Sequence, residues 1–311
     1  MFNIILVPLD GTHFAEAALE PAISLARHYG SKIMLVRAGA EILFAHPPSG
    51  DSPTGMALQP YLRHIAGQIR AQGITTEIME TDEPASKAIV EIAAETGAEL
   101  IVLATRQRSW IDRLIHPGIA GDLLRKVSVP LLLIRPDPVG SGQEITATAP
   151  FTESQAPILV PLDGSPLAEE VLPLAISLAQ TYRKPLVLVR AVDVPYLNLY
   201  PEFSVAVAEP AEMQKARDYL EEQRRVLEAQ GLAISTVVRR GLADSVIVQT
   251  AAERHADLIV MAAHVRTTLA RFFLGSVTRG VLHLPGPAML IQFGKPSPTT
   301  SALEGIRQAV R

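Results

Sequence analysis

The sequence predicts an α/β protein built from two tandem, open, parallel five-stranded sheets flanked by helices. Two observations predict this class: the chain repeats itself, and each copy alternates short apolar runs with helical patterns. Length is a third, because 311 residues exceed what a single hydrophobic core usually spans and suit two domains.

The repeat is clearest in ILVPLDG, which occupies residues 5–11 and returns at residues 158–164. AISLA and LVRA follow in the same register in both copies, whereas later matches are shifted, which places a small insertion between Ala191 and Ala229. Residues 136–155 are rich in Pro, Gly, Ser and Thr, as is typical of a linker. We therefore expect a first domain at 1–136, a linker at 137–156, a second domain at 157–295 and a tail at 296–311.

The elements of the first copy follow in order. The apolar runs are short and do not alternate with polar residues, as expected of strands buried on both faces of a parallel sheet; they lie at 4–9, 32–38, 75–79, 100–104 and 130–134. Helical patterns lie between them, at about 13–29, 56–72, 85–96 and 119–127. Open parallel sheets bind ligands at the carboxyl ends of their strands, near the point where the strand order reverses.

The ILVPLDG motif places a carboxylate at that edge of the sheet. Proline lacks an amide hydrogen, so Pro8 and Pro161 mark where each first strand stops pairing, and Asp10 and Asp163 project beyond the strand end. The next glycine permits a tight turn, and the Thr or Ser after it can cap a helix. From spacing alone, a ligand-binding aspartate and a purely local capping or ion-pairing aspartate are equally good interpretations.

The loop after the fourth strand faces the same edge. In the second copy it runs from Ala262 to Leu274 and leads into Gly275 and Ser276, where a helix N-terminus offers amides and a positive dipole end to an anion. Helix capping alone is the commoner role of such a Gly-Ser pair. The first-copy loop aligns with it without gaps, which matches Arg108 with Arg266, and Arg113 with Arg271.

Together these motifs resemble those of the universal stress protein family. The resemblance is carried by PLDGS after a strand, LVRA where the family often has LLHV, ADLIVMAAH, and RTTLARFFLGSVTRGVLHLPGPAMLI, and it covers nearly all of both copies. It implies a Rossmann-like (HUP) fold with strand order 3-2-1-4-5 and the binding of ATP or another adenine nucleotide. It also implies domain pairing, within the chain or as a homodimer.

The chain departs from the glycine motif of the family's ATP-binding members, which reads glycine, two residues, glycine, nine residues, then glycine followed by Ser or Thr. The second copy keeps only the final pair, with Ala262, Val265, Gly275 and Ser276 at these positions. The first copy keeps none, with Ala104, Gln107, Pro117 and Gly118. Glycines let the backbone approach a phosphate closely, so we predict at most one degenerate nucleotide site, in the second half.

The resemblance also implies roles for individual positions. In the second copy it places adenosine at Asp163, adenine at the backbone of Ala191, and phosphates at Gly275, Ser276 and the Val277 amide, with Ala262 and Val265 at the remaining motif positions and Arg266 and Arg271 as added charge. The corresponding first-copy positions are Asp10, Ala38 and Gly118, where the lost glycines and the missing amide of Pro117 argue against binding.

Composition excludes several classes of function. The chain has no cysteine, which rules out disulfides and thiolate chemistry, and its formal charge of −4 gives no basis for binding nucleic acid. No long apolar run or signal peptide is evident, and the eight histidines lack metal-ligand spacing, so we expect a cytoplasmic protein without a membrane span or metal site.

The leading hypothesis is therefore a stress-response binding module, not an enzyme, with no catalytic residues assigned. One alternative is a nucleotide-independent scaffold with vestigial sites. A weaker alternative is a slow ATPase, although no general base or metal site is evident near the phosphate positions.

Overall fold

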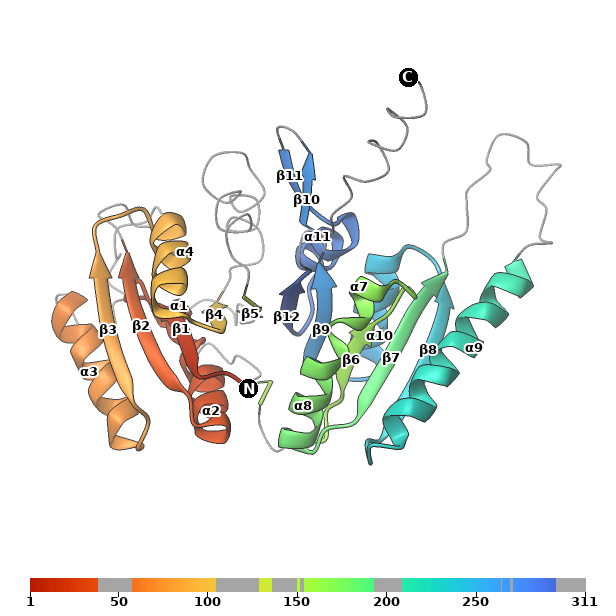
Figure 1. Cartoon of the computed structure of the whole chain (residues 1–311), viewed down its shortest axis with the longest axis horizontal. Coiled ribbons are helices and arrows are strands. Elements are labelled where there is room, and N and C mark those ends of the chain that lie inside the picture. Colours follow the sequence, from red (N-terminus) through yellow and green to blue (C-terminus); the bar gives the residue numbers. More distant parts are fainter. Residues whose placement is uncertain are drawn as a thin grey trace, which may run out of the picture.

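The computed structural model describes residues 1–38, 58–104, 129–135, 150–151, 154–192, 209–263, 265–268 and 271–294. A central sheet runs through the molecule and helices lie on both of its faces (Figure 1).

The first half contributes strands in the order β3-β2-β1-β4-β5, all parallel to one another. They are β1 (Ile4–Pro8), β2 (Lys32–Ala38), β3 (Thr76–Thr81), β4 (Leu100–Ala104) and β5 (Leu131–Ile134). The prediction of these strands is confirmed, with β3 extending two residues further than expected.

The second half repeats the arrangement as β8-β7-β6-β9-β12. Its strands are β6 (Ile158–Pro161), β7 (Leu186–Val192), β8 (Ile234–Arg240), β9 (Leu258–Ala263) and β12 (Ala288–Phe293). Both halves thus have the order 3-2-1-4-5 that the resemblance implies. The strand order reverses between β1 and β4, and again between β6 and β9.

The two halves share one ten-stranded sheet, because β5 and β12 pair antiparallel with Leu132 opposite Leu290. The expectation of two separate five-stranded sheets is wrong in this respect. Each fifth strand would otherwise expose an edge of unpaired backbone groups beside apolar side chains, and pairing the two edges covers both. This contact is also the intramolecular domain pairing that the resemblance implies.

The helices alternate with the strands as predicted, with one difference. The pattern at 13–29 is two helices rather than one, α1 (His13–Glu16) and α2 (Leu19–Tyr29), because the proline at position 21 suits only the first turn of a helix. The others are α3 (Leu58–Ala71), α4 (Ala85–Thr96), α7 (Pro166–Glu169), α8 (Leu172–Tyr182), α9 (Glu209–Glu228), α10 (Ala243–Glu253) and α11 (Ser276–His283). The predicted helix at 119–127 lies outside the described residues.

A hydrophobic core lies on each face of the sheet, because side chains of a strand alternate between faces. In β1, Ile5 and Val7 face the core under α2 and α3, whereas Leu6 faces the core under α4. Both cores continue into the second half, the first under α8 and α9 and the other under α10 and α11. The halves therefore share their cores as well as their sheet.

Helices α2 and α8 add a polar contact between the halves. The Tyr29 hydroxyl lies 3.1 Å from both Ser177 Oγ and Thr181 Oγ1, and the Tyr182 hydroxyl lies 3.2 Å from Ser24 Oγ. The Tyr182 ring also packs against Phe151, with ring centroids 5.0 Å apart. Burial raises the pKa of the Tyr182 hydroxyl above its ordinary value, so it remains a hydrogen-bond donor.

Two buried cations secure the chain near the junction. Arg135, directly after β5, donates to the carbonyls of Val281 and Leu284 at the end of α11 in the other half. Lys184, whose side chain is fully buried, lies 2.6 Å from Asp257 Oδ2 and donates to Ser154 Oγ at 2.9 Å. Lys184 thereby fixes the segment through which the chain enters the second half.

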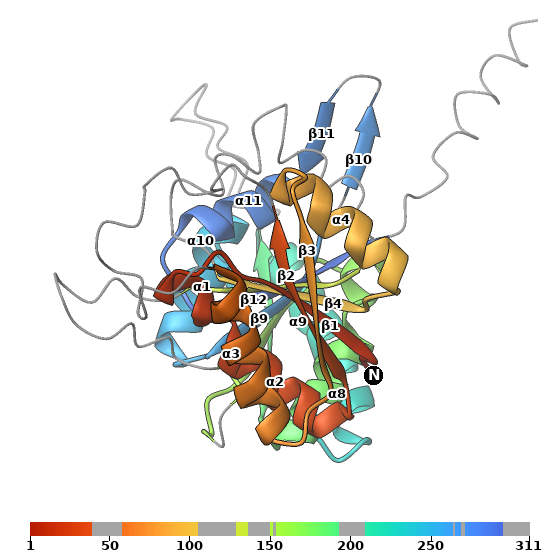
Figure 2. The same ribbon diagram turned by 90° about the vertical axis from the view of Figure 1, so that its left-hand side faces the viewer.

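A two-stranded hairpin stands apart from the main sheet, formed by β10 (Val265–Thr268) and β11 (Arg271–Leu274). It projects from the end of the molecule where the parallel strands have their carboxyl ends (Figures 1 and 2). The hairpin occupies the stretch for which a loop was predicted.

Candidate functional site

The turn after β6 presents Asp163 at the carboxyl edge of the sheet. Strand β6 ends at Pro161, as predicted, and Gly164 has φ of 86°, a left-handed conformation that favours glycine. Asp163 Oδ1 accepts a hydrogen bond from the Ser165 amide at 2.8 Å, and Ser165 Oγ caps α7 by accepting from the Ala168 amide at 3.2 Å. The exposed Asp163 carboxylate retains its second oxygen for a ligand, since no described residue donates to it.

The turn after β1 has the same geometry. Gly11 has φ of 82°, Asp10 Oδ1 accepts from the Thr12 amide at 2.9 Å, and Thr12 Oγ1 accepts from the Ala15 amide at 3.2 Å. Thr12 Oγ1 also donates to Asp10 Oδ1 at 2.6 Å. The predicted caps are confirmed in both halves, and the local role of the aspartates is real in both.

Next to Asp163, the Arg190 side chain lies against the turn. A Cβ atom on Gly164 would stand only 3.1 Å from Arg190 Nη1, which means that the guanidinium covers this glycine. The guanidinium carbon lies 4.9 Å from the centre of the Tyr219 ring, a cation–π geometry. Tyr219 is held in turn by α7, since its hydroxyl donates to Glu169 Oε1 at 2.8 Å. Arg190 on β7 is thus held in place by Tyr219 on α9, which is itself bonded to Glu169 on α7.

The first half repeats this group with one change. Tyr61 donates to Glu16 Oε1 at 2.8 Å, as Tyr219 does to Glu169. Arg37 stands at the position of Arg190, but it forms an ion pair with Glu80 on β3, with Nη1 and Oε2 3.8 Å apart. The residue paired with Arg190 in the same register on β8 is Val238, which carries no charge.

The pKa of each tyrosine hydroxyl is raised above its ordinary value. Burial is the main cause in both, followed by the hydrogen bond to Glu169 for Tyr219 and to Glu16 for Tyr61. Both hydroxyls therefore stay protonated near neutral pH and act as donors.

The two halves also differ in charge along their outermost strands. Glu80 belongs to β3, which is followed by Asp82, whereas β8 ends in Arg239 and Arg240. Arg239 is bound to Glu253, with Nη1 and Oε1 2.8 Å apart. The carboxyl edge next to the first turn is therefore acidic, and the edge next to the second carries more positive charge.

Helix α11 begins where the sequence predicts it. Gly275 is the N-cap, with φ of −50° and ψ of 143°, and supplies no capping side chain. Ser276 is exposed, and Val277 packs on the core beneath α10 and α11. The first amides of α11 lack intrahelical acceptors, as at any helix N-terminus, and Gly275 leaves them to solvent or a ligand.

The segment before α11 differs from the predicted phosphate loop. Ala262 lies in β9 opposite Gln292, and Val265 is the first residue of β10 and lies opposite Leu274. In the β10–β11 hairpin, backbone N–H and C=O groups bond to the neighbouring strand. A phosphate-binding loop would instead offer its N–H groups to the ligand. The β-branched residues of β10 (VRTT) and the two phenylalanines of β11 (RFFL) favour strands and explain the hairpin. In the sequence, the family's loop motif outweighed this signal.

Of the remaining predicted positions, some lie at the carboxyl edge, some lie in the hairpin, and some lie outside the described residues. Ala191 lies near the end of β7 and Ala38 at the end of β2, both at the carboxyl edge. Arg266 lies in β10 and Arg271 in β11. The first-half positions Gln107, Arg108, Arg113, Pro117 and Gly118 lie outside the described residues, as do the side chains of Val265, Arg266 and Arg271.

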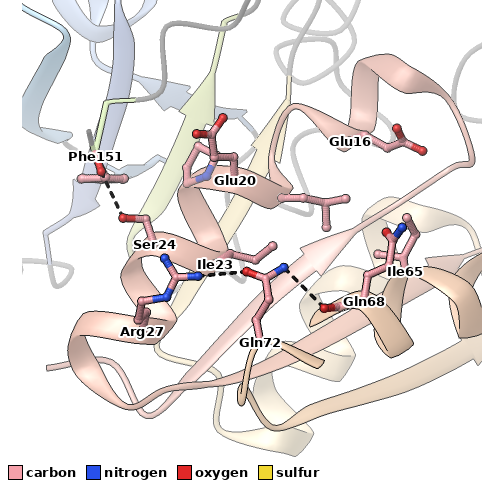
Figure 3. A pocket seen from close by; sticks show the side chains of 11 residues that line it. Glu16, Glu20, Ile23, Ser24, Arg27, Ile65, Gln68, Gln72 and Phe151 are labelled. Atoms are coloured by element: carbon pink, nitrogen blue, oxygen red, sulfur yellow. Dashed lines mark hydrogen bonds between the residues drawn. The ribbon is translucent and has the colours of Figure 1, made fainter. Parts of the chain in front are cut away.

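A separate pocket of about 570 Å³ lies between α2 and α3, with Phe151 at one end. Figure 3 shows Arg27 and Gln72 joined across it by a hydrogen bond of 2.9 Å. Of the residues around the two turns, its lining includes only Glu16. The pocket extends along α2 from Leu19 to Arg27.

Among the described residues, no group of three or more His, Asp and Glu side chains is placed to hold a metal ion. None of the described helices is long and apolar enough to cross a membrane.

Sequence reasoning missed Arg190, Tyr219 and Glu169 as site residues. A signal was present, since the arginine of LVRA, the tyrosine of the following helix and the glutamate after PLDG all recur between the copies. That these three residues contact one another is visible only in the fold, which brings three distant segments together.

Comparisons with known proteins agree with this architecture. A sequence model of the universal stress protein family matches residues 1–135 and 156–291. A universal stress protein of Mycobacterium tuberculosis is 31% identical over 196 residues, which cover 63% of this chain and 61% of that protein, so the match spans less than two thirds of the relative. One from Methanocaldococcus jannaschii is 31% identical over 126 residues, or 40% of this chain and 74% of the relative.

Solved structures are similar over the whole length. A protein of unknown function from Pseudomonas aeruginosa has a TM-score of 0.65 at 19% identity, covering 99% of this chain and 98% of its own. A universal stress protein from Archaeoglobus fulgidus has a TM-score of 0.62 at 16% identity, covering 93% and 95%. At these identities the likeness establishes the fold.

Proposed function

Because the chain belongs to the universal stress protein family, we propose that it is a stress-response binding module with one adenine-nucleotide site, in its second half. The observation that carries this proposal is the position of Asp163. It stands at the end of β6, beside the point where the strand order reverses toward β9, and one carboxylate oxygen is left for a ligand.

The remaining parts of the site follow from the same edge. The amides at the start of α11 and the helix dipole suit phosphate, and Asp163 suits the hydroxyl groups of a ribose. Adenine as the base rests on the resemblance of the motifs to those of the family's nucleotide-binding members. The hairpin in place of a glycine loop makes this a degenerate version of the family's site.

We propose that the first half binds no nucleotide. Asp10 has the same geometry as Asp163, but Arg37 is neutralised by Glu80 and the adjacent edge is acidic. An anionic ligand is therefore disfavoured there. The domain limits proposed for these two units are residues 1–136 and 157–295, in a cytoplasmic protein.

The test is to purify the protein, denature it and identify released small molecules by mass spectrometry, with calorimetric titration of the stripped protein by ATP. We expect an adenine nucleotide, or binding of ATP by the stripped chain. Absence of both would exclude this function.

That negative outcome would favour a second candidate, a nucleotide-independent scaffold. One observation supports it: hydrogen bonds within the turns already give both aspartates a local role. A slow ATPase is the weaker alternative, since the described residues provide no metal-binding cluster to assist phosphoryl transfer.

A further inference from the structure

We propose that the pocket between α2 and α3 is a second binding site, which takes a short extended peptide with free ends. The pocket lies in the first half, on different elements from the turn of Asp163, so the inference does not depend on the nucleotide site. Its volume of about 570 Å³ is in the range of small-ligand sites in proteins.

Opposite charges stand along the wall that α2 contributes. Glu20 and Arg27 both line the pocket and are seven residues apart on this helix, which separates them by about 10 Å along its axis. In the part of the chain that the structure describes, Glu20 has neither a hydrogen bond nor an ion pair, and Arg27 donates only to the Gln72 amide oxygen, at 2.9 Å. The two side chains are labelled in Figure 3, with Ile23 on the helix between them. The pocket therefore offers a carboxylate and a guanidinium that lack charged partners, at a fixed separation.

The lining between these charges is partly apolar and partly amide. Ile23 is half-buried and Ile65 is buried, so together they offer a surface to one aliphatic side chain. Gln68 and Gln72 on α3 supply side-chain amides, which donate and accept hydrogen bonds as a peptide backbone does.

A short peptide has the same features in the same order, namely an ammonium group, an apolar side chain between backbone amides, and a carboxylate. An extended chain advances about 3.3 Å per residue, so a tripeptide spans about 10 Å. The charges of the pocket place its N-terminus at Glu20 and its C-terminus at Arg27.

The second copy of the repeat provides an internal comparison. The positions that correspond to Glu20 and Arg27 hold Pro173 and Gln180, so the second half has no charge at either place. Ile65 corresponds to Gln223, whose Nε2 donates to Glu169 Oε1 at 3.4 Å. The pair of charges thus belongs to the first half and is no general feature of the repeat.

The experiment follows the amide NMR spectrum of the full chain during titration with the tripeptide Ala-Leu-Ala. We expect shifts at residues of α2 and α3 and a dissociation constant below about 1 mM. Acetylating the N-terminus of the peptide or amidating its C-terminus should each weaken binding about 2-fold to 5-fold, because Glu20 and Arg27 are exposed and exposed ion pairs contribute little.

Variants assign each end of the peptide to its residue. Glu20→Gln should bind the free and the acetylated peptide equally and still distinguish the amidated one. Arg27→Gln should bind the free and the amidated peptide equally and still distinguish the acetylated one. Gln180→Ala, the matched control in the second half, should behave as the unaltered protein, and melting temperatures show that each variant is folded.

Three results would overturn the inference. One is the absence of shifts at α2 and α3 with the peptide at about 5 mM, well above the expected dissociation constant. Another is equal affinity of the unaltered protein for the free and the blocked peptides. The third is a folded Glu20→Gln or Arg27→Gln protein that still distinguishes the end assigned to that residue. ATP titration of the same samples reports the proposed function separately, because its shifts are expected at the carboxyl edge of the second half.

Discussion

Asp10 and Asp163 have the same immediate geometry and different neighbours. Each accepts a hydrogen bond from the amide two residues later, at 2.9 Å and 2.8 Å respectively. The difference lies one strand away, where Arg37 is paired with Glu80 and Arg190 is stacked on Tyr219. At the scale of single residues, the partner of the arginine distinguishes the surroundings of the two turns.

Tyr219→Phe tests the support beneath Arg190. The variant keeps the ring and removes the hydroxyl, so we expect a loss of about 1 kcal/mol in the free energy of unfolding, with AMP affinity changed by less than about 2-fold. Tyr61→Phe should cost a similar amount of stability and leave binding untouched. Urea unfolding and calorimetric titration measure both. A Tyr219→Phe protein that folds normally but no longer binds AMP would contradict this expectation and show that binding requires the hydrogen bond from Tyr219 to Glu169.

How much of the site could be predicted depends on the distance over which its residues act. The aspartates, glycines and caps belong to a single turn, so their positions were readable from the sequence. Arg190 and Tyr219 lie on different elements, and the contrast between Glu80 and Val238 depends on the β2–β3 and β7–β8 registers. No local pattern encodes a register between strands separated by a helix.

Among the elements, the strands were predicted well because uniform apolar runs identify strands buried on both faces. The break between α1 and α2 and the hairpin β10–β11 were not predicted. The break follows from Pro21, which suits only the first turn of a helix, and the hairpin follows from a β propensity that the family's loop motif outweighed. The hairpin matters most, because it replaces the loop that would surround a phosphate.

The buried pair of Lys184 and Asp257 is the clearest energetic feature between elements. Burial raises the pKa of the Asp257 carboxyl, although Lys184 opposes the shift. Lys184→Met should lower the free energy of unfolding by about 3–5 kcal/mol, because it leaves a buried carboxylate unpaired. Lys184→Met with Asp257→Leu should recover most of that loss.

The pH dependence of Lys184→Met has a defined sign. A carboxyl whose pKa is raised in the folded state binds protons more tightly there, so its penalty is absent at low pH and grows as the pH rises. The loss in urea unfolding should therefore shrink as the pH falls toward about 5. A loss that grows on acidification would contradict the assignment.

At the scale of the whole molecule, the β5–β12 pair turns two repeats into one sheet with continuous cores. The family resemblance predicted the order of strands within each repeat. It did not predict the union of the sheets, because an apolar fifth strand such as LLLI is equally compatible with pairing inside the chain or between chains.

Arg135→Ala tests whether the halves unfold together. Arg135 is buried and donates to the carbonyls of Val281 and Leu284 in the other half. Loss of the Arg135 side chain should lower the free energy of unfolding by about 1–3 kcal/mol and shift one common unfolding transition. Circular dichroism and amide hydrogen exchange in both halves measure that transition. Two separate transitions, of which only one moves, would show that the repeats are energetically independent.

The central claim is that a duplicated fold retains one nucleotide site, and the stoichiometry of ATP binding tests it most directly. Calorimetric titration should give one ATP per chain, abolished by Asp163→Ala and unchanged by Asp10→Ala. Two equivalents of ATP, or equal loss of binding in both variants, would contradict the account.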